Sequence, residues 1–287
     1  MILVRISGGI GNQMFQYAAA RRLAEQHGTR LCLDTSWFRN VPAGHTARAY
    51  ELDQLSITGL VSRRRVYGLR TAPLPLRPLA YYRTRRPRFR PARERHFHFD
   101  PDVLTLPNNV WLSGYRLSEK YFADIAPIIR AEFEVRAAPS TANRAHITAM
   151  SSCTSVAVHV RRGDFLRDAS RQGATDLDYY AQAADVIRLR CDDPVFFVFS
   201  DDPEWVRANL VLNGTTRFVD HNRDAQSSED LRLMSSCRHQ IIANSSYSWW
   251  GAWLNPNPER VVIAPKKWMA DPNCDTRDVV PADWIVL

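Results

Sequence analysis

Residues 155–164 read Ser-Val-Ala-Val-His-Val-Arg-Arg-Gly-Asp, a short apolar run that ends in two adjacent arginines. The run has no polar alternation, which is typical of a strand buried on both faces of a parallel sheet. Similar short runs, mostly β-branched or aromatic, follow along the chain at 195–200, 216–220, 240–244 and 260–265. We therefore expect a parallel sheet in the second half of the chain.

Helical patterns separate these runs, at Tyr179–Arg190, Glu204–Leu210, Glu229–Cys237 and Tyr247–Leu254. Ser228 is placed to cap the third helix, with two acidic residues in its first turn. Regular alternation of strand and helix at this spacing predicts a doubly wound sheet.

The first half begins in the same way, with a strand at Ile2–Ile6, a helix over 12–27 and a strand at Arg30–Asp34. We expect order to resume at Val110–Leu112 and in a helix from Ser118 onward. The small, polar stretch 137–152 predicts a boundary, which gives two Rossmann-like domains, 1–140 and 153–287, with a cleft between them. In such sheets ligands bind beyond the carboxyl ends of the strands.

The net charge of +8 is concentrated in one segment. Between Ser62 and His98 there are twelve arginines and one glutamate, a local charge of +11 that leaves −3 for the remainder. This favours an anionic partner such as lipid head groups, lipid-linked phosphates or nucleic acid. The alternative is a solvated insertion, which the five prolines at 73, 75, 78, 87 and 91 also suit.

The 287 residues contain no apolar run long enough for a membrane span and no signal peptide at the start, so we expect a cytoplasmic protein. The five cysteines are scattered without CxxC spacing, which argues against a disulfide framework or a zinc site. Asp176-Leu177-Asp178 follows a polar loop and not a strand, so we interpret it as a chance match to a metal-binding motif. We expect neither a metal nor a cofactor.

The twin arginines carry the strongest chemical signal. Arg161 and Arg162 directly after a buried strand would be costly without an anionic partner, and their forked guanidinium groups match phosphate oxygens. The alternative is that one of them pairs with Asp164 and the other faces solvent. His159, two residues before Arg161, is interpreted as a core histidine.

Three further polar groups are expected at strand ends. A glycine turn, Gly8-Gly9-Ile10-Gly11-Asn12-Gln13, lies between strand and helix, where an anion can bind, although it also suits a purely structural turn. It fails the dinucleotide fingerprint GxGxxG because Met14 takes the place of the third glycine. Ser200, Asp201 and Asp202 could bind a nucleotide or cap the next helix, and Asn244, Ser245 and Ser246 are natural phosphate partners.

Together these segments resemble glycosyltransferase family eleven, the α-1,2-fucosyltransferases. The matching stretches are GGIGNQMFQYAAARRLA (8–24), YELDQL (50–55), GYRLSEKYF (114–122), HVRRGDF (159–165), FFVFSDDPEWV (196–206), LMSSCRH (233–239), IIANSSYSWWGAWLNPNP (241–258) and VVIAPKKW (261–268). The HxRRxD element is shared with fucosyltransferases of other linkage, whereas the block at 245–254 and the opening turn are more specific. The arginine-rich segment does not resemble the family in detail.

The resemblance implies a GT-B-like fold with an acceptor-side N-terminal domain and inverting transfer of L-fucose from GDP-fucose, its donor partner. Arg161 would hold the β-phosphate, in a loop shaped by His159, Arg162 and Asp164. Asp201 or Asp202 would contact guanine or ribose, with Ser200 and Asn244 beside them, and Ser245 and Ser246 would face the diphosphate. Asn12 would approach the acceptor or fucose, beside Gly9, Gly11 and Gln13. Asp164 and Asp168 are the candidates for a base.

We expect the acceptor to be an oligosaccharide. It would be lipid-linked if the basic segment contacts an anionic membrane. We expect no nucleic acid partner. The alternatives are a fucosyltransferase of another linkage, a Rossmann oxidoreductase, or a basic nucleic-acid-binding protein. The missing GxGxxG counts against the oxidoreductase. Neither of the last two alternatives accounts for four polar motifs at strand ends.

Overall fold

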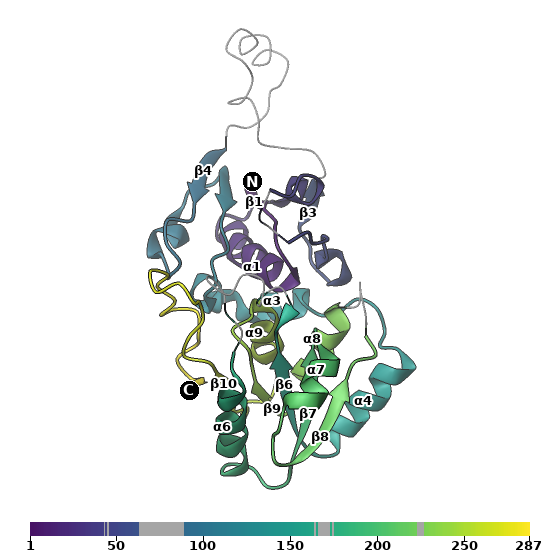
Figure 1. Ribbon diagram of the computed structural model, residues 1–287. Helices are drawn as coiled ribbons and strands as arrows, with labels where there is room; N and C mark the ends of the chain where they lie inside the picture. The colour runs from purple at the N-terminus through teal and green to yellow at the C-terminus, as the bar shows by residue number, and fades with distance from the viewer. Residues whose placement is uncertain are drawn as a thin grey trace, which may run out of the picture. The chain divides into compact units, whose positions relative to one another are not determined.

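The structure, a computed structural model, describes residues 1–42, 44, 46–62, 89–163, 165, 173, 175–222 and 227–287. These residues divide into two compact units. Unit 1 contains Met1–Leu52 and Ile57–Glu132, and unit 2 contains Asp53–Ser56 and Phe133–Leu287. Each unit is a parallel sheet with helices beside it (Figure 1), which confirms the predicted α/β fold class with two Rossmann-like units.

The described part of unit 1 holds a five-stranded sheet in the order β3-β2-β1-β5-β4. The strands, which all pair in parallel, are β1 (Ile2–Arg5), β2 (Leu31–Asp34), β3 (Leu60–Ser62), β4 (Arg90–Arg93) and β5 (Val110–Ser113). The chain runs outward from β1 to β3 and then continues on the other side of β1. The strand order therefore reverses between β1 and β5, the point at which such sheets place their ligands.

Helix α1 (Ile10–Gln26) confirms the helix predicted over 12–27. It packs on β1 and β2, and most of its residues are buried. The helix expected from Ser118 onward is broken. It consists of short 3-10 turns, η5 (Glu119–Tyr121) and η6 (Ala123–Ile125), before α3 (Ala126–Glu132). Phe122 interrupts it because its backbone is not helical, with φ of −149° and ψ of 9°, and its buried ring has its centroid 6.2 Å from that of Phe15. The remaining short 3-10 helices are η1 (Ser36–Arg39), η2 (Leu52–Gln54) and η4 (Pro101–Thr105).

The described part of unit 2 holds a six-stranded sheet in the order β11-β10-β9-β6-β7-β8. Its parallel strands are β6 (Thr154–Val160), β7 (Pro194–Ser200), β8 (Thr215–Val219), β9 (His239–Ile241), β10 (Val262–Ala264) and β11 (Ile285–Val286). Here the strand order reverses between β6 and β9. The central strand β6 is buried along nearly its whole length, whereas β8 alternates between exposed and covered residues because it lies at an edge.

The α-helices in the described part of unit 2 are α4 (Thr141–Ser151), α6 (Leu177–Arg188), α7 (Pro203–Asn209), α8 (Ser227–Ser236) and α9 (Ser246–Trp253). Residues 141–151, which we expected between the domains, form α4, capped by Ser140 and packed on α8 and β6. Ser228 lies inside the first turn of α8. Its hydroxyl donates to Oε1 of Gln54 at 2.6 Å, so it does not cap the helix.

Helix α9 is the apolar centre of unit 2. Trp249 and Trp250 are both fully buried, with ring centroids 4.9 Å apart in an edge-on arrangement. The Trp249 indole Nε1 donates to the carbonyl of Val279 at 2.8 Å, which satisfies its polar atom. Both tryptophans therefore belong to the core.

Asp176 caps helix α6, because its Oδ1 accepts the backbone N–H of Tyr179 at 2.8 Å. We expect Asp176→Ala to lower the free energy of unfolding by about 1 kcal/mol, the usual effect of losing a cap. Asp178→Ala is the matched control, since Asp178 is an exposed first-turn residue of the same helix. The two variants are compared by urea unfolding. An equal effect of both substitutions would contradict the cap assignment.

Candidate functional site

The carboxyl ends of β6 and β7 bring two arginines and two carboxylates together. The strands pair with Val160 beside Ser200, so the residues that follow them are neighbours. The Arg161 Nη1 lies 3.0 Å from Oδ2 of Asp201, and the Arg162 backbone N–H donates to Oδ1 of the same carboxylate at 2.9 Å. The Arg162 Nε lies 3.3 Å from Oδ2 of Asp202. The arginines therefore have anionic partners from the neighbouring strand, while Asp164, the partner we considered, lies outside the described residues.

The two guanidinium groups have different surroundings. That of Arg162 stacks on the Trp205 ring, with its central carbon 3.2 Å from the ring centroid. Stacking and the carboxylate of Asp202 together fix it in place. The guanidinium of Arg161 lies 5.6 Å from the centroid of Phe165, and its side chain is about one-fifth exposed. The Arg162 side chain is 18% exposed, close to the 20% of Arg161, so the two arginines differ in the stacking on Trp205 and not in exposure.

Gly163 allows Asp201 to approach the loop. A Cβ at this position would lie 2.5 Å from Oδ2 of Asp201, a distance that real contacts do not reach. A side chain would therefore displace the carboxylate that holds Arg161. The need for glycine here comes from the close approach of the two strand ends and not from a left-handed backbone.

The second carboxylate and Ser200 order the turn into helix α7. Ser200 Oγ accepts the backbone N–H of Asp202 at 3.0 Å, and Oδ1 of Asp202 accepts that of Trp205 at 3.3 Å. Asp202 is therefore the helix cap, the structural alternative that we considered. The side chains of Asp201 and Asp202 are 24% and 37% exposed, so each also presents an outer surface to a ligand.

His159 is buried in β6 and stays neutral. Burial, and then the charge of Arg161, lower its pKa to about 3. Its ring tilts against that of Tyr247, with centroids 5.5 Å apart, and its Nδ1 is buried without a hydrogen-bond partner in the described structure. A neutral imidazole of this kind cannot supply a proton at neutral pH, so its role is to pack beneath the arginine loop.

The polar residues after β9 mostly bind the protein itself. The Asn244 amide donates to the carbonyls of Gly173 and Trp268, at 3.0 and 3.1 Å, and its Oδ1 accepts the Thr175 hydroxyl at 3.1 Å. Ser245 caps α9 by accepting the backbone N–H of Tyr247 at 3.3 Å. Ser246 is the first residue of α9 and is partly exposed. Of these three residues, Ser246 is the one that is not buried.

In unit 1 the glycine turn joins β1 to α1. Gly8 has φ of +76°, which favours glycine, and Gly9 precedes the helix without a capping side chain. Gln13 is fully buried: its Nε2 donates to the carbonyls of Gly8 and Ala49 at 2.9 and 2.8 Å, and its Oε1 accepts the N–H of Glu51 at 3.0 Å. Gln13 therefore holds the turn. Gly11 is buried inside α1, and Asn12 is half-buried in its first turn.

Our sequence analysis missed a cluster centred on Asn143, which is 1% exposed. Its Oδ1 accepts from His221 Nε2 at 2.6 Å and from the Asn222 amide at 3.1 Å, and its Nδ2 donates to Glu229 at 2.7 Å. Asn222 also donates to Asp230 at 2.8 Å. The sequence gives little indication of this cluster, since Asn143 lies in the polar stretch 137–152 that we predicted as a domain boundary. Trp205 and Thr175 were missed as well, because a stacking or loop contact leaves no periodic pattern.

Burial in this cluster raises the pKa of Asp230 to about 6, opposed by the Asn222 hydrogen bond and aided by the charge of Glu229. A carboxyl whose pKa is higher in the folded state binds more protons there, so stability should fall as pH rises from about 4 to 6. We expect Asp230→Asn to abolish this fall in stability and to raise the free energy of unfolding by up to about 3 kcal/mol above pH 6. Thermal unfolding of wild type and variant between pH 4 and pH 8 measures this pH dependence. A variant that shows the wild-type pH slope would contradict the assignment.

In the described part of the chain, no group of three or more histidine, cysteine or carboxylate side chains is arranged to hold a metal ion. Among the same residues, no helix is both long enough and apolar enough to span a bilayer.

Comparison with known proteins identifies a matching family and several similar proteins. The model of a family described as "Glycosyl transferase family 11" matches residues 94–287. The O-antigen biosynthesis glycosyltransferase WbnK of Escherichia coli is 32% identical, over 93% of this chain and 95% of its own. An alpha-1,2-colitosyltransferase of E. coli is 29% identical over 99% and 98%. Galactoside alpha-(1,2)-fucosyltransferase 1 of Pan troglodytes is 30% identical over 86% of this chain and 63% of its own.

Proposed function

Because the chain belongs to glycosyl transferase family 11, we propose that it transfers L-fucose from GDP-β-L-fucose to the 2-hydroxyl of an acceptor sugar, with inversion at the anomeric carbon. The acceptor that we propose is a galactoside in a surface glycan or O-antigen. The single observation that carries the proposal is the placement of Arg161 at the end of β6. Its guanidinium is fixed on one side by Asp201 and is partly exposed.

A diphosphate leaving group gains negative charge as its bond to the sugar breaks. Donors fixed beforehand stabilise that charge without reorganisation when the bond breaks. The carboxylate of Asp201 holds the Arg161 guanidinium in place, while stacking on Trp205 holds Arg162. In this proposal Arg161 binds the β-phosphate, Ser246 lies beside the diphosphate, and the outer faces of Asp201 and Asp202 meet the nucleoside.

The acceptor hydroxyl needs a base only to the extent that its proton leaves early in the displacement. His159 does not supply this function, since its ring is buried in the core and its pKa is lowered to about 3, which makes the imidazole a very weak base. Asp164 and Asp168 remain our candidates by resemblance, and both lie outside the described residues. We place Asn12 and the glycine turn of unit 1 on the acceptor side.

A second donor deserves a direct test. One relative, aligned over 99% of this chain, is an alpha-1,2-colitosyltransferase. Colitose differs from L-fucose in lacking the 3-hydroxyl, so the same diphosphate contacts would serve both donors. Kinetics with GDP-fucose and GDP-colitose on one galactoside acceptor, with the linkage read by NMR, decide between them. A higher kcat/KM for GDP-colitose would replace fucose in the proposal.

We further propose that the acceptor is carried by a lipid and that the protein acts in the cytoplasm at the inner face of the membrane. The charge of +11 over residues 62–98 supports this, because basic residues are attracted to anionic lipid surfaces. Most of that segment, residues 63–88, lies outside the described residues.

We expect Arg161→Ala to lower kcat/KM by about 10²–10³-fold, the usual loss for one donor to a developing anion. Arg207→Ala is the matched control, since Arg207 is a half-exposed arginine of the same unit that pairs with Asp220. Turnover is measured with folded protein, checked by its melting curve. Near-normal turnover by Arg161→Ala would remove Arg161 from the mechanism.

Transfer is also expected to continue in excess EDTA. The arginines of this site can perform the phosphate binding that a divalent ion performs in other glycosyltransferases, and Asp176 is engaged as a helix cap. Initial rates with EDTA, and after addition of Mg²⁺ or Mn²⁺, measure the effect. Loss of activity that one of these ions specifically restores would show that the diphosphate is bound through a metal.

A further inference from the structure

The two edges of the unit 1 sheet differ in character. The β4 edge carries exposed Arg90, Pro91 and Arg93, residues that usually prevent an edge strand from pairing with another molecule. The β3 edge carries Leu60 and Val61, which are 55% and 45% exposed. Because consecutive side chains of a strand point to opposite faces, exposure of both means that neither face of β3 is fully covered.

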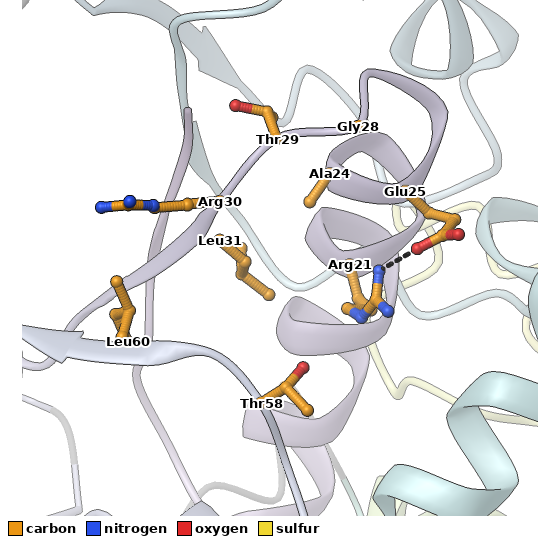
Figure 2. Close-up of a pocket in the computed structure, with 9 residues that line it drawn as sticks. All are labelled: Arg21, Ala24, Glu25, Gly28, Thr29, Arg30, Leu31, Thr58 and Leu60. Carbon is orange, nitrogen blue, oxygen red and sulfur yellow. Dashed lines mark hydrogen bonds and ion pairs between the residues drawn. The ribbon is translucent and has the colours of Figure 1, made fainter.

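A hollow of about 480 Å³ lies beside Leu60 (Figure 2). It opens where α1 ends and Gly28, at φ of +52°, turns the chain into β2. A Cβ added to Gly28 would meet nothing within 4 Å, so this turn leaves the space open. The hollow is lined by Arg21, Ala24, Glu25, Gly28, Thr29, Arg30, Leu31, Thr58 and Leu60.

The charged groups of the hollow are unequally paired. Arg21 binds Glu25 at 2.6 Å and Glu132 at 2.9 Å, so both of these carboxylates have a cationic partner. The Arg30 guanidinium is exposed and makes no ion pair or side-chain hydrogen bond with any residue that the structure describes. The lining of the hollow thus includes the Arg30 guanidinium and the exposed Leu60 side chain, and Val61 follows on the other face of the edge strand. A cationic group and exposed aliphatic side chains are the two features that a phosphate head group and its acyl chains require.

The sequence that follows this edge carries charge of the same sign as Arg30. The segment with charge +11 begins at Ser62, the last residue of β3, so its first arginines, Arg63 to Arg65, directly follow the aliphatic pair in the chain. Apolar residues next to a basic cluster are typical of surfaces that bind anionic bilayers, because burial and charge attraction add to each other.

We propose that the β3 edge of unit 1 docks on an anionic membrane, with Leu60 and Val61 entering the interface and Arg30 binding a lipid phosphate at the hollow. The inference deepens the proposed function by naming the surface that would bring the enzyme to a lipid-linked acceptor. It is nevertheless tested without any transfer reaction.

The test is co-sedimentation with vesicles of phosphatidylglycerol and phosphatidylcholine, and with vesicles of phosphatidylcholine alone. Wild type should bind the anionic vesicles only, and binding should weaken between about 0.1 M and 1 M salt, where the Debye length falls from about 10 Å to 3 Å. Arg30→Gln should lower the partition coefficient about fivefold, the effect of one basic residue near the surface. The double substitution of Leu60 and Val61 by serine should lower it further.

Two matched controls keep the test specific. Arg39→Gln removes an exposed arginine of unit 1 that does not line the hollow, and Leu189→Ser removes an aliphatic side chain of unit 2 that is 87% exposed. Both should bind as wild type does. Melting curves check that the serine variant is folded, and Arg30→Gln, an exposed substitution, tests the proposal independently of that variant.

The proposal is wrong if the wild-type protein does not bind anionic vesicles, or if the control variants and the test variants lose binding equally. It is also wrong if inorganic phosphate or RNA binds through Arg30 while vesicles do not. Turnover with a soluble galactoside is measured in parallel. Turnover without vesicle binding overturns the docking surface alone, and vesicle binding without turnover overturns the transferase assignment alone.

Discussion

The carboxylate of Asp201 holds together the candidate site at the carboxyl edge of unit 2. Two guanidinium groups at the end of a buried strand need a counter-charge, and this one carboxylate meets the side chain of Arg161 and the backbone of Arg162. The pairing of β6 with β7 sets its position, since Val160 lies beside Ser200. The glycine at 163 follows from the same contact, because a Cβ there would collide with the carboxylate.

Both units place their polar turns where the strand order of the sheet reverses. In unit 2 the reversal lies between β6 and β9, which lead into Arg161 and into the Asn244 turn. In unit 1 it lies between β1 and β5, and β1 leads into the glycine turn. At such a point the connections leave to opposite sides and cannot cover the strand ends. The same topology therefore provides each unit with an open polar edge.

Many residues expected to hold a ligand hold the protein instead. Gln13, Asn244 and Ser245 use their polar atoms on backbone groups of neighbouring turns. This is a physical consequence of a strand-end site, since the backbone groups of a tight turn must themselves find partners. A pattern of amides and hydroxyls predicts that a turn is polar, but it does not say whether an amide faces a backbone carbonyl or a ligand. Part of the side chain remains exposed at Arg161, Arg162, Asp201, Asp202 and Ser246.

The sequence by itself determined the α/β class, most strands of the two parallel sheets and the positions of the polar turns, because burial on both faces leaves an apolar run that ends abruptly at each strand end. It also determined the family, through motifs in both halves of the chain. It did not indicate the edge strands β3, β4 and β11 or helix α4. The tertiary structure alone decided which partners meet. Strand order sets Asp201 beside Arg161, and burial keeps His159 neutral. Helix α4 occupies the stretch that we predicted as a boundary, and its Asn143 forms the centre of a buried polar cluster. These contacts join residues dozens of positions apart, so no local pattern records them.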